Sequence, residues 1–400
     1  MKRELLATTA LIAAGMIASG GSAYAQANGP AQKGKPVLTI GGWVEGIVGT
    51  ATQNHRTNTG IGTRVGWDSQ YDSEFHFNGA VTLDNGIKIR TQAELEGEVS
   101  GDQWDEAYMA ISGSFGELRI GSMDNAIYQA LTPISGSWAT QVGQNLSLDS
   151  ADWISAPAGR VGTGNIRLNI GDNDSNKVNY FTPRVEGFQL ALSYLPSFEE
   201  CITSGTSQNT QCNSSIASVS TNAHNGWSAG FTFDRRFDEL RTAFGAGYIT
   251  AKRTQNPVTN KDPGGGDPKG WSLGGLIGYE GFRIAAGYKQ EHNLLAIPAI
   301  GAASVDSLIS HDISTFDIGG RYNWGKNWVS LGWQHSKSPA DKTIKGDDKT
   351  DLFLASYRRD LAPGVQYRFN VFYADYKGEN PGSTYDSKGY AVSTSVRVAF

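Results

Sequence analysis

The sequence predicts an all-β fold, a transmembrane antiparallel β-barrel of sixteen strands, and three observations lead to it. Apolar residues recur at every second position along much of the chain. Short turns alternate with longer polar segments. No stretch after residue 25 approaches the roughly 18 consecutive apolar residues that a membrane-spanning helix needs. A chain that enters a membrane without such helices must close into a barrel, because only closure satisfies all its backbone hydrogen bonds.

Apolar side chains keep a period of two in several well-separated segments. Four clear cases are 188–194, 227–233, 282–288 and 367–373. Because successive side chains of a strand point to opposite faces, each segment is predicted to be a strand with one apolar and one polar face. Phe372 breaks the pattern of the last segment, since it falls on the polar face.

The connections between these segments fix the number of strands. Seven short turns are predicted at 84–86, 112–114, 184–187, 236–238, 280–281, 325–327 and 362–364, where Gly, Asn, Asp and Pro supply the required backbone angles. Eight longer segments alternate with them, at about 51–70, 99–102, 125–174, 196–225, 251–268, 292–309, 337–350 and 377–386. Fifteen connections join sixteen strands, and short turns on one side with long loops on the other are typical of outer-membrane barrels.

A polar and an apolar face fit either a soluble sandwich or a barrel in a membrane, so other features decide between them. Aromatic residues gather near strand ends, where Tyr and Trp suit the depth of lipid headgroups; they are Tyr194, Tyr248, Tyr279, Tyr288, Tyr322, Trp227, Trp271 and Trp328. Charged residues lie on the polar face, which lines water inside a barrel. The lumen-lining candidates are Glu94, Glu96, Arg283, Lys289, Arg321 and Arg397.

The first residues resemble an export signal. Lys2 and Arg3 precede a short apolar run, and small residues surround Ala25. This arrangement predicts a cleavable signal peptide at residues 1–25, followed by a single barrel domain at 26–400. Removing Lys2, Arg3 and Glu4 from 34 basic and 39 acidic side chains leaves 32 and 38, a net charge of −6. The acidic balance, without any basic tract, argues against nucleic acid as a partner.

Two cysteines, Cys201 and Cys212, lie in a Ser/Thr/Asn-rich segment. In an oxidising compartment they are candidates for a disulfide within one loop, and two free thiols are the alternative. Neither a disulfide nor a pair of free thiols implies a catalytic role here. The six histidines are scattered without metal-ligand spacing, and neither a Gly-x-Ser-x-Gly elbow nor a phosphate-binding loop occurs. The sequence therefore predicts no enzyme, no cofactor and no metal, with a loose calcium site among loop acids as the less favoured alternative.

The last strand carries the sharpest signal. Apolar residues alternate up to a terminal aromatic residue, with Tyr390, Val396, Val398 and Phe400 on one face. In this strand the sequence resembles the general porins of Gram-negative bacteria, whose closing strand ends in Phe. The resemblance implies that the barrel-assembly machinery of the outer membrane reads this strand.

The resemblance extends along the chain in order and spacing. Leu83–Lys88, Asp105–Tyr108 and Gly113–Gly121 look like successive porin hairpins, and Asn179–Pro183 looks like the hairpin after the third outer loop. The resemblance implies that this third loop, about 125–174, folds into the lumen and narrows it. It also implies a homotrimer, for which Leu38, Ile40 and Val44 are candidate contact residues.

In such porins, acids on the third loop face basic residues on the wall. The corresponding constriction candidates here are Asp124, Asp149 and Asp152 on the loop side, and Lys88, Arg90 and Arg119 on the strand side. The Pro-Glu-Phe-Gly stretch of enterobacterial porins is absent from this loop. The alternative is that these charges do no more than solvate the lumen.

Taken together, the residues and the resemblance predict a passive pore. We expect an outer-membrane channel that passes ions and small hydrophilic solutes, with outer-membrane lipid as its surroundings and a weak cation preference from the charge of −6. A substrate-specific channel on the same barrel is the alternative. It would be favoured by a ladder of aromatic residues or a cluster of arginines inside the pore.

Overall fold

The computed structural model describes residues 33–54, 66–97, 104–156, 166–170, 172, 174–198, 223–253, 266–294, 311–338, 346–378 and 386–400. The predicted signal peptide at residues 1–25 lies outside these residues, and so do Cys201 and Cys212. The cleavage site and the disulfide therefore stay predictions. Among the helices of the described residues, none combines the length and the apolar character needed to cross a bilayer.

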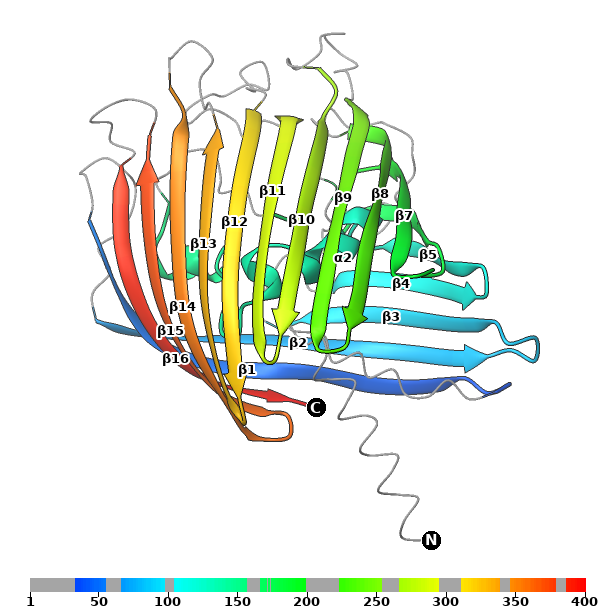
Figure 1. The fold of residues 1–400 in the computed structure, drawn as a ribbon, viewed down its shortest axis with the longest axis horizontal. Coiled ribbons are helices and arrows are strands. Elements are labelled where there is room, and N and C mark those ends of the chain that lie inside the picture. Colours follow the sequence, from blue (N-terminus) through cyan, green and yellow to red (C-terminus); the bar gives the residue numbers. More distant parts are fainter. Residues whose placement is uncertain are drawn as a thin grey trace, which may run out of the picture.

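In the described part of the chain, sixteen strands form one closed barrel (Figure 1). Each strand pairs antiparallel with its neighbour in sequence, and β1 pairs with β16 to close the ring. The strands are β1 Val37–Gln53, β2 Trp67–Thr82, β3 Lys88–Glu96, β4 Trp104–Gly113, β5 Gly116–Ser122, β6 Asn176–Phe181, β7 Phe188–Ser197, β8 Ala223–Phe237, β9 Leu240–Arg253, β10 Lys269–Tyr279, β11 Phe282–Leu294, β12 His311–Trp324, β13 Asn327–Ser338, β14 Asp348–Ala362, β15 Val365–Lys377 and β16 Ser387–Ala399. The predicted sixteen-stranded antiparallel barrel is confirmed.

All seven predicted turns lie between paired strands. The turn from β10 to β11 contains only Glu280 and Gly281, both with positive φ, at 42° and 90°. A two-residue turn with positive φ at both positions matches the right-handed twist of the strands that it joins, and Gly at the second position adopts it without strain. Local sequence therefore determines where each short hairpin turns.

The apolar face of the strands points outward. In β1, Val44 and Val48 are exposed, whereas the intervening Trp43, Glu45 and Ile47 are buried in the barrel. In β16, Tyr390, Val396 and Val398 are likewise exposed. An apolar outer face suits contact with lipid tails. A soluble protein seldom exposes large continuous apolar areas.

The end of the chain contributes to closure of the barrel. The backbone N–H of Phe400 donates to the carbonyl of Gly42, and the N–H of Gly42 donates to the carbonyl of Phe400, both at 3.0 Å. The ring of Phe400 lies 5.8 Å from that of Phe75 on β2. The terminal aromatic residue thus sits where three strands meet.

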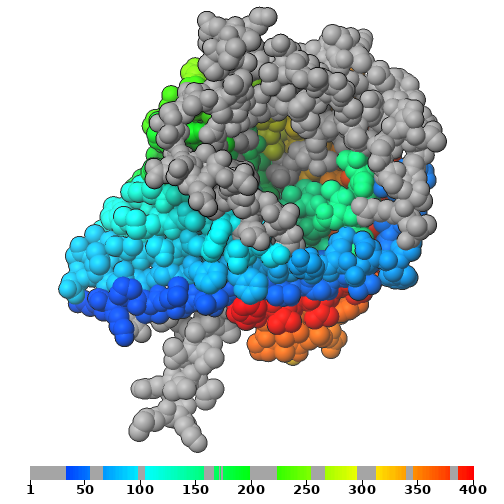
Figure 2. All heavy atoms as spheres, turned by 180° about the vertical axis from the view of Figure 1, so that it is seen from behind, coloured from blue at the N-terminus to red at the C-terminus, as the bar shows by residue number. Residues whose placement is uncertain are grey.

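The connection from β5 to β6 lies against the buried face of the barrel wall. Residues 123–156 of it, here called the inner segment, contain α2 Ala126–Leu131, the 3-10 helices η1 Thr132–Ile134 and η2 Ser137–Ala139, and α3 Asp149–Trp153. Figure 2 shows green atoms of this part of the chain within a hollow bordered by blue strands. In order along the chain, α2 contacts β6 to β9, η1 contacts β9 and β10, η2 contacts β11 to β13, and α3 contacts β15. The inner segment therefore follows the wall around much of the barrel.

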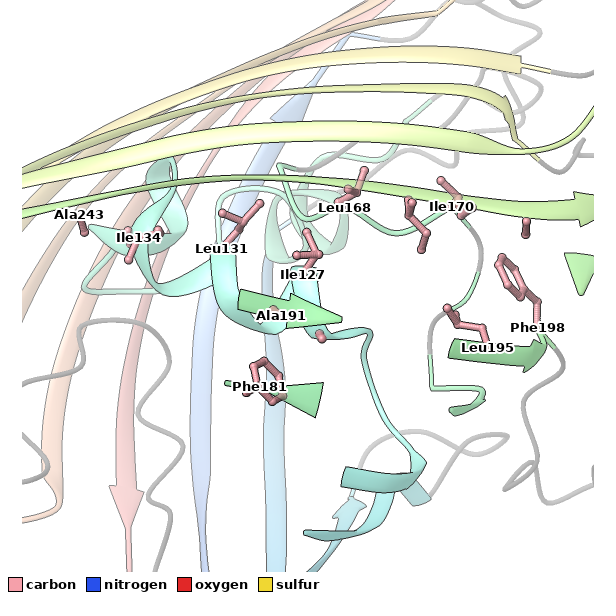
Figure 3. Close-up of a cluster of buried hydrophobic side chains, with 14 of the residues drawn as sticks. Ile127, Leu131, Ile134, Leu168, Ile170, Phe181, Ala191, Leu195, Phe198 and Ala243 are labelled. Atoms are coloured by element: carbon pink, nitrogen blue, oxygen red, sulfur yellow. The ribbon is translucent and has the colours of Figure 1, made fainter. Parts of the chain in front are cut away.

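Two apolar clusters hold the inner segment in place. In one, Ile127, Leu131 and Ile134 are buried with Ala191 and Ala243 of the wall (Figure 3). In the other, Trp153 and Leu146 are buried with wall residues that include Phe372. The break in alternation at Phe372 is thereby explained, because this ring faces inward and packs in an apolar cluster rather than in water.

Glycines on the wall allow the close approach of α2. Gly230 of β8 and Gly247 of β9 are paired in register. A Cβ atom at Gly230 would lie 2.4 Å from Ile127 Cδ1, and one at Gly247 would lie 2.3 Å from Ile127 Cγ2. Both distances are far below van der Waals contact, so the absence of a side chain at these two positions creates the groove that receives Ile127.

A substitution in this groove tests the packing of the inner segment. Gly247→Val places methyl groups where Ile127 sits, and overpacking of this kind costs about 1–3 kcal/mol. We expect amide hydrogen exchange in residues 126–131 to accelerate about 5- to 100-fold, while the strands keep their protection. The matched control is Gly46→Val, because a Cβ at Gly46 meets nothing within 4 Å. Unchanged exchange in α2 of the Gly247→Val protein would contradict this packing.

Candidate functional site

A cavity of about 390 Å³ lies inside the barrel between the inner segment and the wall around β1 to β4. Its charged lining consists of nine carboxylates and three guanidinium groups. They are Glu45, Asp72, Glu74, Glu96, Asp105, Asp124, Asp149, Asp152 and Asp174, with Arg167, Arg368 and Arg397. Acidic groups therefore dominate this part of the interior.

The three predicted loop acids all line this cavity. Asp124 follows β5, and its backbone N–H donates to Glu106 Oε1 at 2.9 Å. Asp149 begins α3, and its Oδ2 accepts the backbone N–H of Asn145 at 2.6 Å. Asp152 lies in the same short helix. The structure thus brings together three acids that are up to 28 positions apart in the sequence.

The environment of Asp149 favours its neutral form. Burial raises the pKa of the Asp149 carboxyl to about 7, and the carboxylates of Asp152 and Glu45 act in the same direction. The hydrogen bond from Asn145 opposes the shift. A carboxyl group with this pKa changes its charge near neutral pH.

Two of the three guanidinium groups of the cavity lie beside Glu45. Arg368 Nη1 of β15 lies 2.9 Å from Glu45 Oε2, and Arg397 Nη1 of β16 lies 3.8 Å from the same oxygen. The Arg397 guanidinium also lies 3.6 Å from the centre of the Trp43 ring. Arg397 was among the sequence candidates, whereas Arg368 was missed, although its alternation with Tyr367 and Phe369 places it on the inner face.

The predicted basic residues of the early strands lie elsewhere. Arg90 and Arg119 both form ion pairs with Glu117 of β5. Arg119 Nη1 also donates to Gln129 Oε1 of α2 at 2.7 Å. Lys88 is exposed at the start of β3. None of these basic side chains is among the residues that line the cavity, and their role in a constriction stays a prediction.

The other lumen candidates lie on the inner face of their strands. Glu96 lines the cavity, and Glu94 is buried against His76. Lys289 Nζ lies 3.0 Å from Glu291 Oε2 on the same strand. Arg283 of β11 and Arg321 of β12 are directly opposite each other in the register. Two guanidinium groups therefore lie side by side, and they form a positively charged spot near the short-turn end of the barrel.

An aromatic ring lies beside the arginines. The guanidinium carbons of Arg321 and Arg358 are 5.2 and 4.3 Å from the centre of the Trp328 ring. Trp328 Nε1 donates to Asp360 Oδ2 at 3.0 Å. The prediction that Trp328 lies at the lipid headgroups is therefore wrong. Its position near a strand end indicated depth along the strand, but not the face from which the ring projects.

Sequence reasoning also missed a group of metal-binding residue types. Glu74 and His76 of β2 and Glu94 of β3 each have a potential ligand atom within 4.8 Å of the others. Their signal in the sequence is Glu74-Phe75-His76, in which alternate residues share a face. The partner Glu94 is found only through the pairing of β2 with β3.

A closed barrel with an apolar outer surface and a charged cavity defines the class of outer-membrane channel proteins. The sequence matches the family model described as Gram-negative porin over residues 7–381. The chain belongs to the Gram-negative porin family. A search of curated proteins finds no match.

Solved structures show the same fold at low sequence identity. The anion-selective porin from Comamonas acidovorans is 16% identical, with a TM-score of 0.58, and the match covers 92% of this chain and all of that one. OmpF of Salmonella typhi is 14% identical, with a TM-score of 0.60 and coverage of 91% and 97%. The trimer form of OmpT from Vibrio cholerae is 13% identical, with a TM-score of 0.54 and coverage of 91% and 99%.

The family and the fold together establish the function in outline. The protein is an outer-membrane channel for passive diffusion. The family and the fold point to a channel rather than an enzyme. The alternative of a substrate-specific channel is not favoured by these comparisons.

We expect the charge of Asp149 to make the ion preference of the channel depend on pH. Its carboxyl is mainly neutral below about pH 7 and charged above it. We expect the ratio of cation to anion permeability to rise as the pH increases through 7. Reversal potentials in a salt gradient measure this ratio, and Asp149→Asn should remove the step centred near 7. The same step in the Asp149→Asn protein would assign the titration to another group.

Proposed function

We propose that the cavity is the selective part of a general pore with a weak preference for cations. The observation that carries this proposal is the excess of carboxyl over guanidinium groups around the cavity, nine against three, of which Asp149 is charged above about pH 7. A negative potential in a narrow aqueous passage concentrates cations and repels anions, without any tight binding site. The net charge of the whole chain, −5, has the same sign.

The inner segment is the element that narrows this pore. Trp138, Gln144 and Asp149 of the segment line the cavity, while Glu74 and Asp105 line it from the strands. The charges are unevenly distributed around the cavity, since Arg368 and Arg397 come from β15 and β16, whereas most of the acids come from β2 to β4 and from the inner segment. This uneven distribution produces a local field in the passage, which orients dipolar solutes as they pass.

Conductance in a planar bilayer tests the proposal. The refolded protein should give stepwise openings, and a salt gradient should give a reversal potential of the sign for cation preference. A unit charge acts on an ion about 10 Å away in water with about 0.4 kcal/mol. Asp152→Asn should therefore lower the cation permeability about twofold and raise the anion permeability by a similar factor, so that the permeability ratio falls about fourfold.

Asp84→Asn is the matched control for this measurement. Asp84 lies in the turn from β2 to β3, and its side chain is 93% exposed. Its removal should leave the permeability ratio unchanged. A wild-type preference for anions would contradict the proposal, and so would an equal effect of the two substitutions.

We also propose that export and assembly use the two ends of the chain. Residues 1–25 would direct export and be cleaved after Ala25, as their charge and apolar run indicate. Tyr390, Val396, Val398 and Phe400 would then be read by the barrel-assembly machinery. This proposal is supported by the outward apolar face of β16, where Tyr390, Val396 and Val398 are exposed.

A homotrimer is proposed on the outer face of β1. Leu38, Ile40 and Val44 are all exposed there, with 68%, 56% and 41% of their surface accessible. A similar structure, OmpT, is described as a trimer. A continuous apolar strip at the strand that closes the barrel suits contact with a second copy as well as with lipid.

A pair of matched substitutions separates these two kinds of contact. Ile40 on β1 and Ile284 on β11 are exposed to similar extents, 56% and 61%. Arginine on a lipid-facing position costs up to about 2–4 kcal/mol, so both substitutions lower the stability of the barrel in the membrane by a comparable amount. We expect Ile40→Arg to give monomers in cross-linking and native electrophoresis, while Ile284→Arg stays trimeric. Trimers of equal abundance in both variants would place the interface elsewhere.

A further inference from the structure

Glu74, His76 and Glu94 form a compact cluster on the inner wall of the barrel. Glu74 and His76 are two positions apart in β2, so both side chains project inward. His76 and Glu94 are directly opposite each other in the register of β2 and β3. The strand period and the pairing of two adjacent strands therefore bring the three side chains together.

The distances within the cluster are those of metal ligands. A His76 ring nitrogen, Nε2, lies 3.3 Å from Glu74 Oε1, and Nδ1 lies 3.0 Å from Glu94 Oε1. Ligands of a tetrahedral ion with bonds of about 2.0–2.1 Å are separated by about 3.3 Å. One potential ligand atom from each of the three residues lies within 4.8 Å of the others. An imidazole binds one ion through one nitrogen, so an ion held by His76 Nδ1 and Glu94 requires the Glu74 carboxyl to turn from Nε2 toward it.

Neighbouring residues fix the two carboxylates. Trp43 Nε1 donates to Glu74 Oε2 at 3.2 Å, and Gln92 Nε2 donates to Glu94 Oε1. Hydrogen bonds of this kind orient the ligands of metal sites, and these two leave Glu74 Oε1 and Glu94 Oε2 as the oxygens that can face an ion. The side chains of His76 and Glu94 are 3% and 2% exposed, so they move little. Two of the three ligands are therefore preorganised.

The cluster is also reachable and surrounded by negative charge. Glu74 lines the cavity, where Glu96, Asp72 and Asp105 are also present. A cation that enters the cavity therefore meets Glu74 first, and water in the cavity can supply a further ligand. Two carboxylates with one imidazole suit Zn²⁺ and similar first-row divalent ions better than Mg²⁺, which prefers oxygen ligands alone.

We propose that Glu74, His76 and Glu94 bind one divalent transition-metal ion inside the channel. When both glutamates are ionised, the bound ion offsets their two charges beside the cavity. It therefore lowers both the conductance and the cation preference of the pore. The binding itself does not depend on the proposed ion preference, and it is measurable without any current.

Metal binding to the folded, tag-free protein in detergent is the first test. Titration calorimetry with ZnCl₂ should show one site per chain, and Co²⁺ should give the visible absorption of a tetrahedral site. His76→Gln and Glu94→Gln should each weaken Zn²⁺ binding about tenfold or more. A wild-type protein that binds no Zn²⁺ and gives no Co²⁺ absorption overturns the proposal, because a His76 that only bridges two glutamates produces neither signal.

A second histidine supplies the matched control. His335 Nδ1 lies 2.9 Å from Asp351 Oδ1, but the pair belongs to no three-residue group in the described part of the chain. His335→Gln should leave Zn²⁺ binding unchanged, and equal loss in this variant would overturn the assignment. Circular dichroism of each variant reports folding. If His76→Gln does not fold, the wild-type Co²⁺ spectrum and Glu94→Gln still decide the question.

Channel currents distinguish this proposal from the one on ion preference. Currents recorded with a chelator present test the pore by itself. Addition of micromolar ZnCl₂ should then reduce the wild-type current, whereas the same concentration of MgCl₂ should not. Binding of Zn²⁺ by a protein that conducts no ions would support the metal site and contradict the pore, and the reverse result would do the opposite.

Discussion

The backbone pairing of β1 with β16 is the interaction on which the rest of the structure depends. The register runs from Trp43 opposite Ala399 to Gln53 opposite Gly389. Without this ladder the two strands would present unpaired N–H and C=O groups to lipid, at a cost of several kcal/mol for each group. Closure also brings Glu45 of β1 to Arg368 and Arg397, which are more than 300 positions away in the sequence. The charged centre of the cavity therefore exists because the ring is closed.

Closure alone would leave a wide passage, and the inner segment lies inside the barrel against its wall. Many of its apolar residues pack into the wall of the barrel, and several of its polar residues, among them Gln144, Asp149 and Asp152, line the cavity. The wall accommodates the segment because glycines stand where a side chain would collide with it. These are Gly230 and Gly247 beneath Ile127, and Gly319 beneath Ser137. The same glycines would weaken an ordinary strand. Here their positions follow from packing against the segment rather than from backbone conformation.

Much of the fold could be predicted because hairpins are local. Turn residues and period-two alternation determine strand ends and faces, and both are visible in a single sequence. The site was predicted less completely. Asp124, Asp149 and Asp152 were identified through the length of one loop, but the short helix that carries Asp149 and Asp152 has no extended periodicity. Glu74 and His76 were missed because their significance depends on Glu94, which is adjacent only through strand register. Trp328 was misplaced for a related reason, since depth along a strand does not determine the face.

The path of the inner segment has a mechanical consequence. A barrel of sixteen strands is a thin-walled tube, and lateral pressure in a membrane tends to flatten its cross-section into an ellipse. The segment is attached to the tube at successive points, from β8 near Ile127 to β15 near Trp153. A segment that is attached to successive strands in this way stiffens the barrel against flattening. We therefore expect the segment to keep the bore of the channel constant while the surrounding bilayer changes in thickness and tension.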